Sequence, residues 1–137
     1  MNQLNTRQDA AFTDIIIVGA GFGGLGMGIQ LKRRGHGAFT ILERADDVGG
    51  TWRDNHYPGV ACDVPSHLYS FSFRPNANWS HVFSLCFYFF FFLCDCARDE
   101  GLLPHIRFGT TMLDARWNEA DRQWSVQTSQ GMFTCRV

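Results

Sequence analysis

Apolar residues occur in short runs separated by segments rich in glycine, proline and aspartate. Ile15–Val18 and Phe39–Leu42 are four-residue apolar runs whose composition is typical of buried strands. Between them, residues 24–34 place apolar side chains in rough helical register and end in three basic residues, and Gly35 follows as a C-cap glycine. The pattern predicts a strand, a helix and a second strand.

The C-terminal third has shorter runs of apolar residues. Strands are predicted at residues 106–108, 112–117 and 123–128, the last with the alternation of a half-buried strand. A turn at residues 129–131 leads into residues 132–137, which predicts an antiparallel hairpin. Residues 44–80 show neither the helical nor the strand period of apolar residues, and they are rich in glycine, proline and aromatic residues. Such a long loop is usually functional, and its aromatic content argues against disorder.

One aromatic run stands between the loop and these strands. Residues 87–92 are five phenylalanines and one tyrosine, so a helix there would have no polar face. At about 1.5 Å per residue, a helix over residues 82–94 would cross about two thirds of a bilayer core, so no spanning helix is predicted. The run is expected to form a buried helix or strand. An alternative, testable by transcript sequencing, is that residues 85–94 are translated intron or frameshifted sequence, because their codons are thymine-rich.

Composition limits the remaining possibilities. The chain has 137 residues, of which 45% are hydrophobic and 18% charged, so we expect at most one globular domain. A net charge of −1 argues against nucleic acid and against an acidic membrane surface as partners. The five cysteines are an odd number without paired CxxC spacing, and the histidines lack metal-ligand spacing. We therefore expect no metal site, no disulfide framework and a cytoplasmic location.

The turn after the first strand carries the most specific signal. Its sequence is Gly19-Ala20-Gly21-Phe22-Gly23-Gly24. Gly19 allows a sharp turn, Gly21 allows close approach of a pyrophosphate, and Gly24 allows the helix to pack on the strand. The free N–H groups and dipole at the helix start favour phosphate. Glu43 ends the second strand at about the 20-residue spacing of an acid that binds ribose hydroxyls and repels a 2′-phosphate. This predicts a site for the ADP half of FAD or NAD.

Four further motifs follow in order: Glu43-Arg44, Val48-Gly49-Gly50-Thr51-Trp52, the stretch from Tyr57 to Ser66, and Tyr69. With the glycine turn they closely resemble the Baeyer–Villiger monooxygenases and their flavin-containing monooxygenase relatives, over residues 14–80 and again over residues 95–136. The resemblance implies an α/β fold: an incomplete, Rossmann-like FAD-binding domain over residues 14–137, with a parallel sheet and an added antiparallel hairpin or meander. Residues 1–13 are expected to be a polar lead, and the NADP-binding and substrate domains are absent.

The resemblance also assigns expected roles to individual residues. The first glycine turn would hold the FAD pyrophosphate through Gly19, Gly21, Gly23 and Gly24, and Glu43 would hold the adenosine ribose. The second glycine turn, formed by Gly49, Gly50, Thr51 and Trp52, would run beside the pyrophosphate and ribityl chain. Ala61, Cys62 and Asp63 would approach the nicotinamide of NADPH, Asp63 and Tyr69 would lie near the flavin, and Met112 would touch the adenine region. Asp63 is the candidate catalytic residue, tuning charge beside the flavin; the alternative is a turn or cap aspartate.

The implied function is a flavin-dependent monooxygenase that uses FAD, NADPH and oxygen to oxygenate a small ketone through a flavin C4a-peroxide. Two alternatives stay open: oxygenation of nitrogen or sulfur, and a non-catalytic nucleotide-binding fragment completed by a partner chain. The family's second glycine motif, its fingerprint between domains and its active-site arginine lie outside this sequence. We therefore expect the 137-residue chain alone to be inactive and to bind FAD weakly or not at all.

Overall fold

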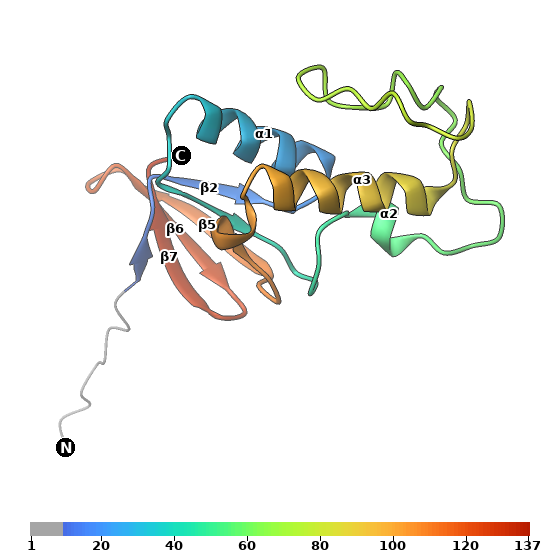
Figure 1. Ribbon diagram of the computed structural model, residues 1–137. Helices are drawn as coiled ribbons and strands as arrows, with labels where there is room; N and C mark the ends of the chain where they lie inside the picture. Colours follow the sequence, from blue (N-terminus) through green and yellow to red (C-terminus); the bar gives the residue numbers. More distant parts are fainter. Residues whose placement is uncertain (1–9) are drawn as a thin grey trace.

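A computed structural model describes residues 10–137, so the first nine residues of the predicted polar lead lie outside the described part. A parallel sheet forms the middle layer, with strands in the order β2 (Ile15–Val18), β3 (Phe39–Leu42) and β4 (Ile106–Arg107). Helices α1 (Phe22–Arg33) and α3 (Cys86–Asp99) lie side by side on one face of this sheet (Figure 1). The α/β class and the strand–helix–strand unit are confirmed.

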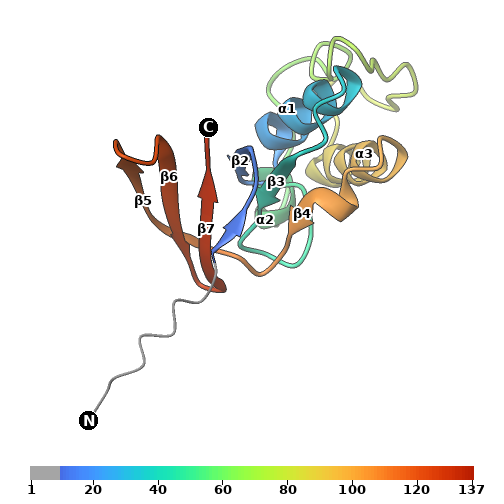
Figure 2. The same ribbon diagram turned by 90° about the vertical axis from the view of Figure 1, so that its left-hand side faces the viewer.

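An antiparallel sheet forms the other layer (Figure 2). Strands β5 (Met112–Asn118), β6 (Gln123–Thr128) and β7 (Gly131–Cys135) are joined by two antiparallel pairings, which confirms the predicted hairpin. Strand β1 (Ala11–Phe12), formed by part of the polar lead, pairs in parallel with β7. A small apolar cluster of Leu42, Val126 and Cys135 connects the two sheets.

The final strand is shorter than predicted because the chain changes partner after Cys135. The N–H groups of Arg136 and Val137 donate to Asp14 O, and Ile16 N–H donates to Val137 O at 2.8 Å. Residues 136 and 137 therefore lie along the outer edge of β2. Val18, further along this edge, is 57% exposed, which is unusual in a parallel sheet, because such strands are normally covered on both faces.

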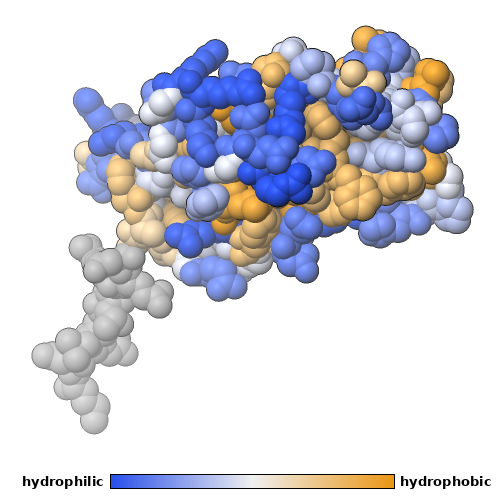
Figure 3. All heavy atoms as spheres, in the orientation of Figure 1, coloured by the Kyte–Doolittle hydropathy of each residue, from blue (hydrophilic) through white to orange (hydrophobic). Residues whose placement is uncertain are grey.

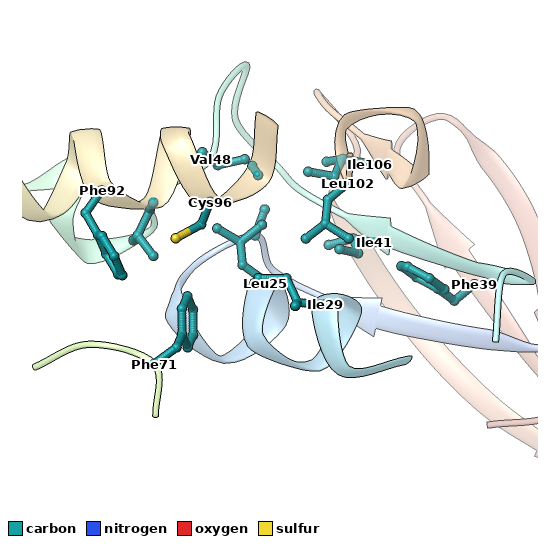
Figure 4. Close-up of a cluster of buried hydrophobic side chains, with 13 residues drawn as sticks. Leu25, Ile29, Phe39, Ile41, Val48, Phe71, Phe92, Cys96, Leu102 and Ile106 are labelled. Carbon is teal, nitrogen blue, oxygen red and sulfur yellow. The ribbon is translucent and has the colours of Figure 1, made fainter. Parts of the chain in front are cut away.

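Helix α1 begins two residues earlier than predicted, because Gly21 adopts an extended conformation and serves as the N-cap. Gly35 has a φ of +81°, which confirms the predicted C-cap glycine. Leu25 and Ile29 face the core, where they meet β3 and α3 (Figure 4). A Cβ atom at Gly28 would lie 3.0 Å from Ile41 Cδ1, so α1 packs too closely on β3 for a larger residue without local movement.

The aromatic run forms the first half of α3. Buried residues recur every three or four positions and contact the core: Cys86, Phe89, Phe92, Leu93, Cys96 and Ala97. Phe87 and Phe91 are 45% and 58% exposed, as expected for a run without a polar face. Apolar side chains accordingly reach the surface on the side of the molecule formed by α3 (Figure 3). Across residues 10–137, no helix combines the length and the apolar character needed to span a bilayer.

The long loop is ordered by its aromatic side chains. Within residues 44–80 the short helix α2 (Thr51–Asp54) is the helical element of the loop, and a 3₁₀ turn, Leu103–His105, precedes β4. Phe71 is buried against Phe22 of α1, with ring centroids 4.8 Å apart. Trp79 packs on Phe89 of α3 at 4.7 Å. The structure thus agrees with the prediction that the loop is not disordered.

Candidate functional site

The first glycine turn connects β2 to α1. Gly19 has a φ of +92°, a conformation that favours glycine, and its N–H donates to Leu42 O at 2.8 Å. A Cβ atom at Gly24 would lie 1.8 Å from Gly19 O and 3.4 Å from Ile17 Cγ2. Close packing of the helix on its strand, predicted from the sequence, therefore depends on Gly24.

The second glycine turn packs directly against the first. Gly49 N–H donates to Ala20 O at 2.9 Å. A Cβ atom at Gly50 would lie 3.2 Å from Gly21 Cα, so the two turns touch backbone to backbone. The short helix α2 begins at the next residue, which places its side chains at the edge of the first turn.

A crevice of about 600 Å³ opens beside these turns, at the carboxyl ends of β2 and β3. This is where open α/β sheets bind their ligands. Six residues predicted from the sequence line it: Gly19, Gly21, Glu43, Gly50, Thr51 and Met112. The other lining residues with polar side chains, which received no predicted site role, are Arg44, Arg53, Asp54, Asn55, Thr110 and Thr111.

Glu43 is held at the floor of the crevice and is 4% exposed. Its Oε2 accepts the N–H of Ala20 at 2.7 Å, and its Oε1 accepts the N–H of Ala45 at 3.0 Å. Arg53 Nη1 lies 3.5 Å from Oε1. A carboxylate has about four acceptor positions and three are used here, so Oε2 can still accept a hydrogen bond from a ligand hydroxyl.

The start of α1 has free donors. Within residues 10–137, the N–H groups of Gly21, Phe22 and Gly23 have no hydrogen-bond partner. A Cβ atom at Gly19 or Gly23 would meet nothing within 4 Å, so open space surrounds the backbone there. Unpaired N–H groups, open space and the positive end of a helix dipole fit a diphosphate.

The remaining predicted residues lie outside the crevice lining. Trp52 lines a second, mainly apolar cavity of about 490 Å³ beyond α2, and its ring centroid is 5.3 Å from that of Tyr69. Gly23, Gly24 and Gly49 form the turns without lining the crevice. Cys62 is buried, whereas Ala61 and Asp63 are exposed on the loop. Roles near a flavin or a nicotinamide remain predictions for these residues.

Arg44, Arg53 and Asp54 are the charged residues of the crevice lining for which the sequence predicted no role. Asp54 Oδ1 accepts from Arg53 Nη2 at 2.8 Å, and Asp54 Oδ2 accepts from Arg44 Nη2 at 3.2 Å. The hydrogen bond from Arg53 is the largest cause that lowers the pKa of Asp54 below its ordinary value. One signal could have identified Arg53: a buried acid needs a cation, and the nearest basic residues after Glu43 are Arg44 and Arg53.

The fold and the glycine-lined crevice define a dinucleotide-binding domain of the Rossmann type. The family described as NAD(P)-binding Rossmann-like domain matches residues 17–85, and the chain belongs to this family.

Among full-length proteins, the chain is similar to Baeyer–Villiger monooxygenases. One from Streptomyces coelicolor is 47% identical over 123 residues, which are 90% of this chain and 24% of that protein. One from Pseudomonas aeruginosa is 38% identical over 131 residues, 96% of this chain and 25% of that protein. The resemblance predicted from the motifs is confirmed, and the chain spans about a quarter of the length of these relatives.

Solved structures give the same relationship. Closed cyclohexanone monooxygenase superposes with a TM-score of 0.87 at 30% identity, over 93% of this chain and 25% of that one. Oxidized steroid monooxygenase bound to NADP superposes with a TM-score of 0.87 at 34% identity, over 92% and 25% of the respective chains.

Proposed function

We propose that this chain supplies the FAD-binding crevice of a flavin-dependent monooxygenase of the Baeyer–Villiger type, which oxygenates a small ketone with NADPH and oxygen. The observation that carries the proposal is that the Glu43 carboxylate and Gly21, whose N–H group is unpaired, line one crevice, with the unpaired N–H groups of Phe22 and Gly23 next along the chain. An ADP moiety needs both a diphosphate site and an acceptor for ribose hydroxyls.

The donors present determine how the cofactor would be held. The N–H groups at the start of α1 would bind the pyrophosphate, and Glu43 would accept a ribose hydroxyl at Oε2. Bound FAD would supply the electron transfer and the activation of oxygen. The protein contributes binding and orientation, and we keep Asp63, Tyr69 and Trp52 as predicted neighbours of the flavin, with Ala61 and Cys62 toward the nicotinamide.

The relatives support the cofactors and the substrate class. A solved relative is described as a complex with FAD and NADP, at a TM-score of 0.85 and 30% identity. Another is ε-caprolactone-bound cyclohexanone monooxygenase, at a TM-score of 0.85 and 29% identity. A lactone bound to a ketone-oxidising relative favours ketone oxygenation. All five cysteines of this chain are free thiols, which supports the reducing cytoplasm as part of the proposal.

Glu43→Gln tests the crevice directly. We expect about 10-fold to 100-fold weaker binding of ADP, because charge-assisted hydrogen bonds to ribose are lost while the side-chain volume is retained. The measurement is a titration of the purified chain by ligand-observed NMR, which covers weak affinities. Asp46→Asn is the matched control, since Asp46 is an exposed acid in the same loop. Equal ADP affinity in wild type and Glu43→Gln would contradict the proposal.

Activity of the isolated chain is a separate prediction. Because the chain spans only about a quarter of its relatives, we expect no ketone-dependent consumption of NADPH when FAD, NADPH, oxygen and cyclohexanone are supplied. The assay follows NADPH absorbance with and without the ketone. Ketone-dependent turnover by this chain would show that the crevice alone is sufficient, and it would overturn the expectation of inactivity.

A further inference from the structure

We propose that Arg53 is a positioning residue of the crevice, which fixes the Glu43 carboxylate and holds the second glycine turn in place. Arg53 lies on α2 and its side chain is 15% exposed. It borders both the nucleotide crevice and the apolar cavity beyond α2. Arg53 therefore forms part of the wall between the crevice and the apolar cavity.

The guanidinium joins three separate parts of the chain. Nη1 donates to the carbonyl of Asp47, just before the second glycine turn, and lies 3.5 Å from Glu43 Oε1 at the end of β3. Nε and Nη2 donate to Asp54 Oδ1 at 3.0 and 2.8 Å. A planar fork with five donors can make these contacts at once, whereas a lysine has a single charged centre.

The charge of Arg53 has no substitute in this region. The Glu43 side chain is 5% exposed, and within the described residues its ion-pair partner is Arg53 alone. Arg44, the neighbouring cation, is 72% exposed and contacts Asp54 instead. A buried charge that loses its partner is strongly unfavourable, so without Arg53 the Glu43 side chain should turn toward water. Ala20 N–H and Ala45 N–H would then lose their acceptor.

The first experiment needs no ligand. Amide hydrogen exchange of Ala20 and Ala45 is measured by NMR in the full 137-residue chain. We expect Arg53→Met and Glu43→Ala each to accelerate exchange at both amides about 10-fold or more, because each amide loses a hydrogen bond to a charged group. Arg74→Met is the control, since Arg74 is a partly buried, ion-paired arginine whose partners, Asp99 and Glu100, lie outside the crevice. It should leave both amides unchanged.

The second experiment rests on the proposed function and uses ADP and 2′,3′-dideoxy-ADP as probes. Wild type should prefer ADP, and both Glu43→Gln and Arg53→Met should lose most of that preference. The double variant should lose no more than either single variant, because Arg53 acts through Glu43. A change in general stability would weaken both probes equally and would not alter the preference.

The outcomes separate the two ideas. Unchanged exchange at Ala20 and Ala45 in Arg53→Met would overturn the positioning role. Accelerated exchange in Arg53→Met would support the positioning role, whatever the result with the two probes. If wild type does not distinguish ADP from 2′,3′-dideoxy-ADP, nucleotide binding through Glu43 is refuted. If Arg53→Met does not fold, exchange at Ala20 and Ala45 is measured in Arg53→Lys instead. Exchange equal to that of wild type would then refute the claim that the planar guanidinium of Arg53 is required.

Discussion

Replacing Gly24 with alanine is expected to destabilise the chain by more than about 3 kcal/mol, at the upper end of overpacking effects. The added methyl group would lie 1.8 Å from Gly19 O, and this oxygen belongs to the backbone of the turn, so no side-chain rotation can relieve the clash. Helix α1 would have to move away from β2. That movement would open the core around Leu25 and Ile29, which are fully buried.

Gly23→Ala is the matched control for Gly24→Ala. It makes the same change one residue earlier in the same helix, where a Cβ atom meets nothing within 4 Å. Its stability should equal that of wild type or exceed it by up to about 1 kcal/mol, because alanine favours helix. Urea unfolding followed by tryptophan fluorescence measures both variants. Equal midpoints would mean that α1 does not pack on β2 as described.

The first glycine unit was predictable because its signals are local. The apolar runs of β2 and β3, the glycines between them and Gly35 each determine nearby backbone geometry, and they agree with one another. The position of Glu43 followed from its spacing along the same unit. The start of α1 was misplaced by two residues because an extended glycine, and no side-chain cap, precedes the helix.

Arg53 was not predictable in the same way. It lies in a loop without periodicity, and its importance comes from the burial of Glu43, ten residues earlier, which is a tertiary property. The aromatic run posed a different problem. Continuous apolar sequence has no period that distinguishes a helix from a strand. The structure settles this question because α3 residues spaced three and four apart, Leu93, Cys96 and Ala97, pack in one cluster with α1 and the sheet.

Phe89→Ala is expected to cost about 3 to 5 kcal/mol, a large part of the stability of a small domain. Phe89 is fully buried, and its ring lies 4.6 Å from Trp52, 5.1 Å from Tyr69 and 4.7 Å from Trp79 between ring centroids. Removing it leaves a cavity at the junction of α3, the long loop and α2. Because Trp52 follows the second glycine turn, that turn should also become looser. Thermal and urea unfolding monitored by circular dichroism measure the loss.

Phe91→Ala makes the same chemical change two residues further along α3, where the side chain is 58% exposed. Helix propensity changes equally in the two variants, so their difference reports burial alone. We expect Phe91→Ala to lie within about 0.5 kcal/mol of wild type and to aggregate less, because an exposed aromatic side chain is removed. Small and equal effects of the two substitutions would mean that the run has no buried face. They would favour the alternative that residues 85–94 are translated intron or frameshifted sequence, which the transcript would then confirm or exclude.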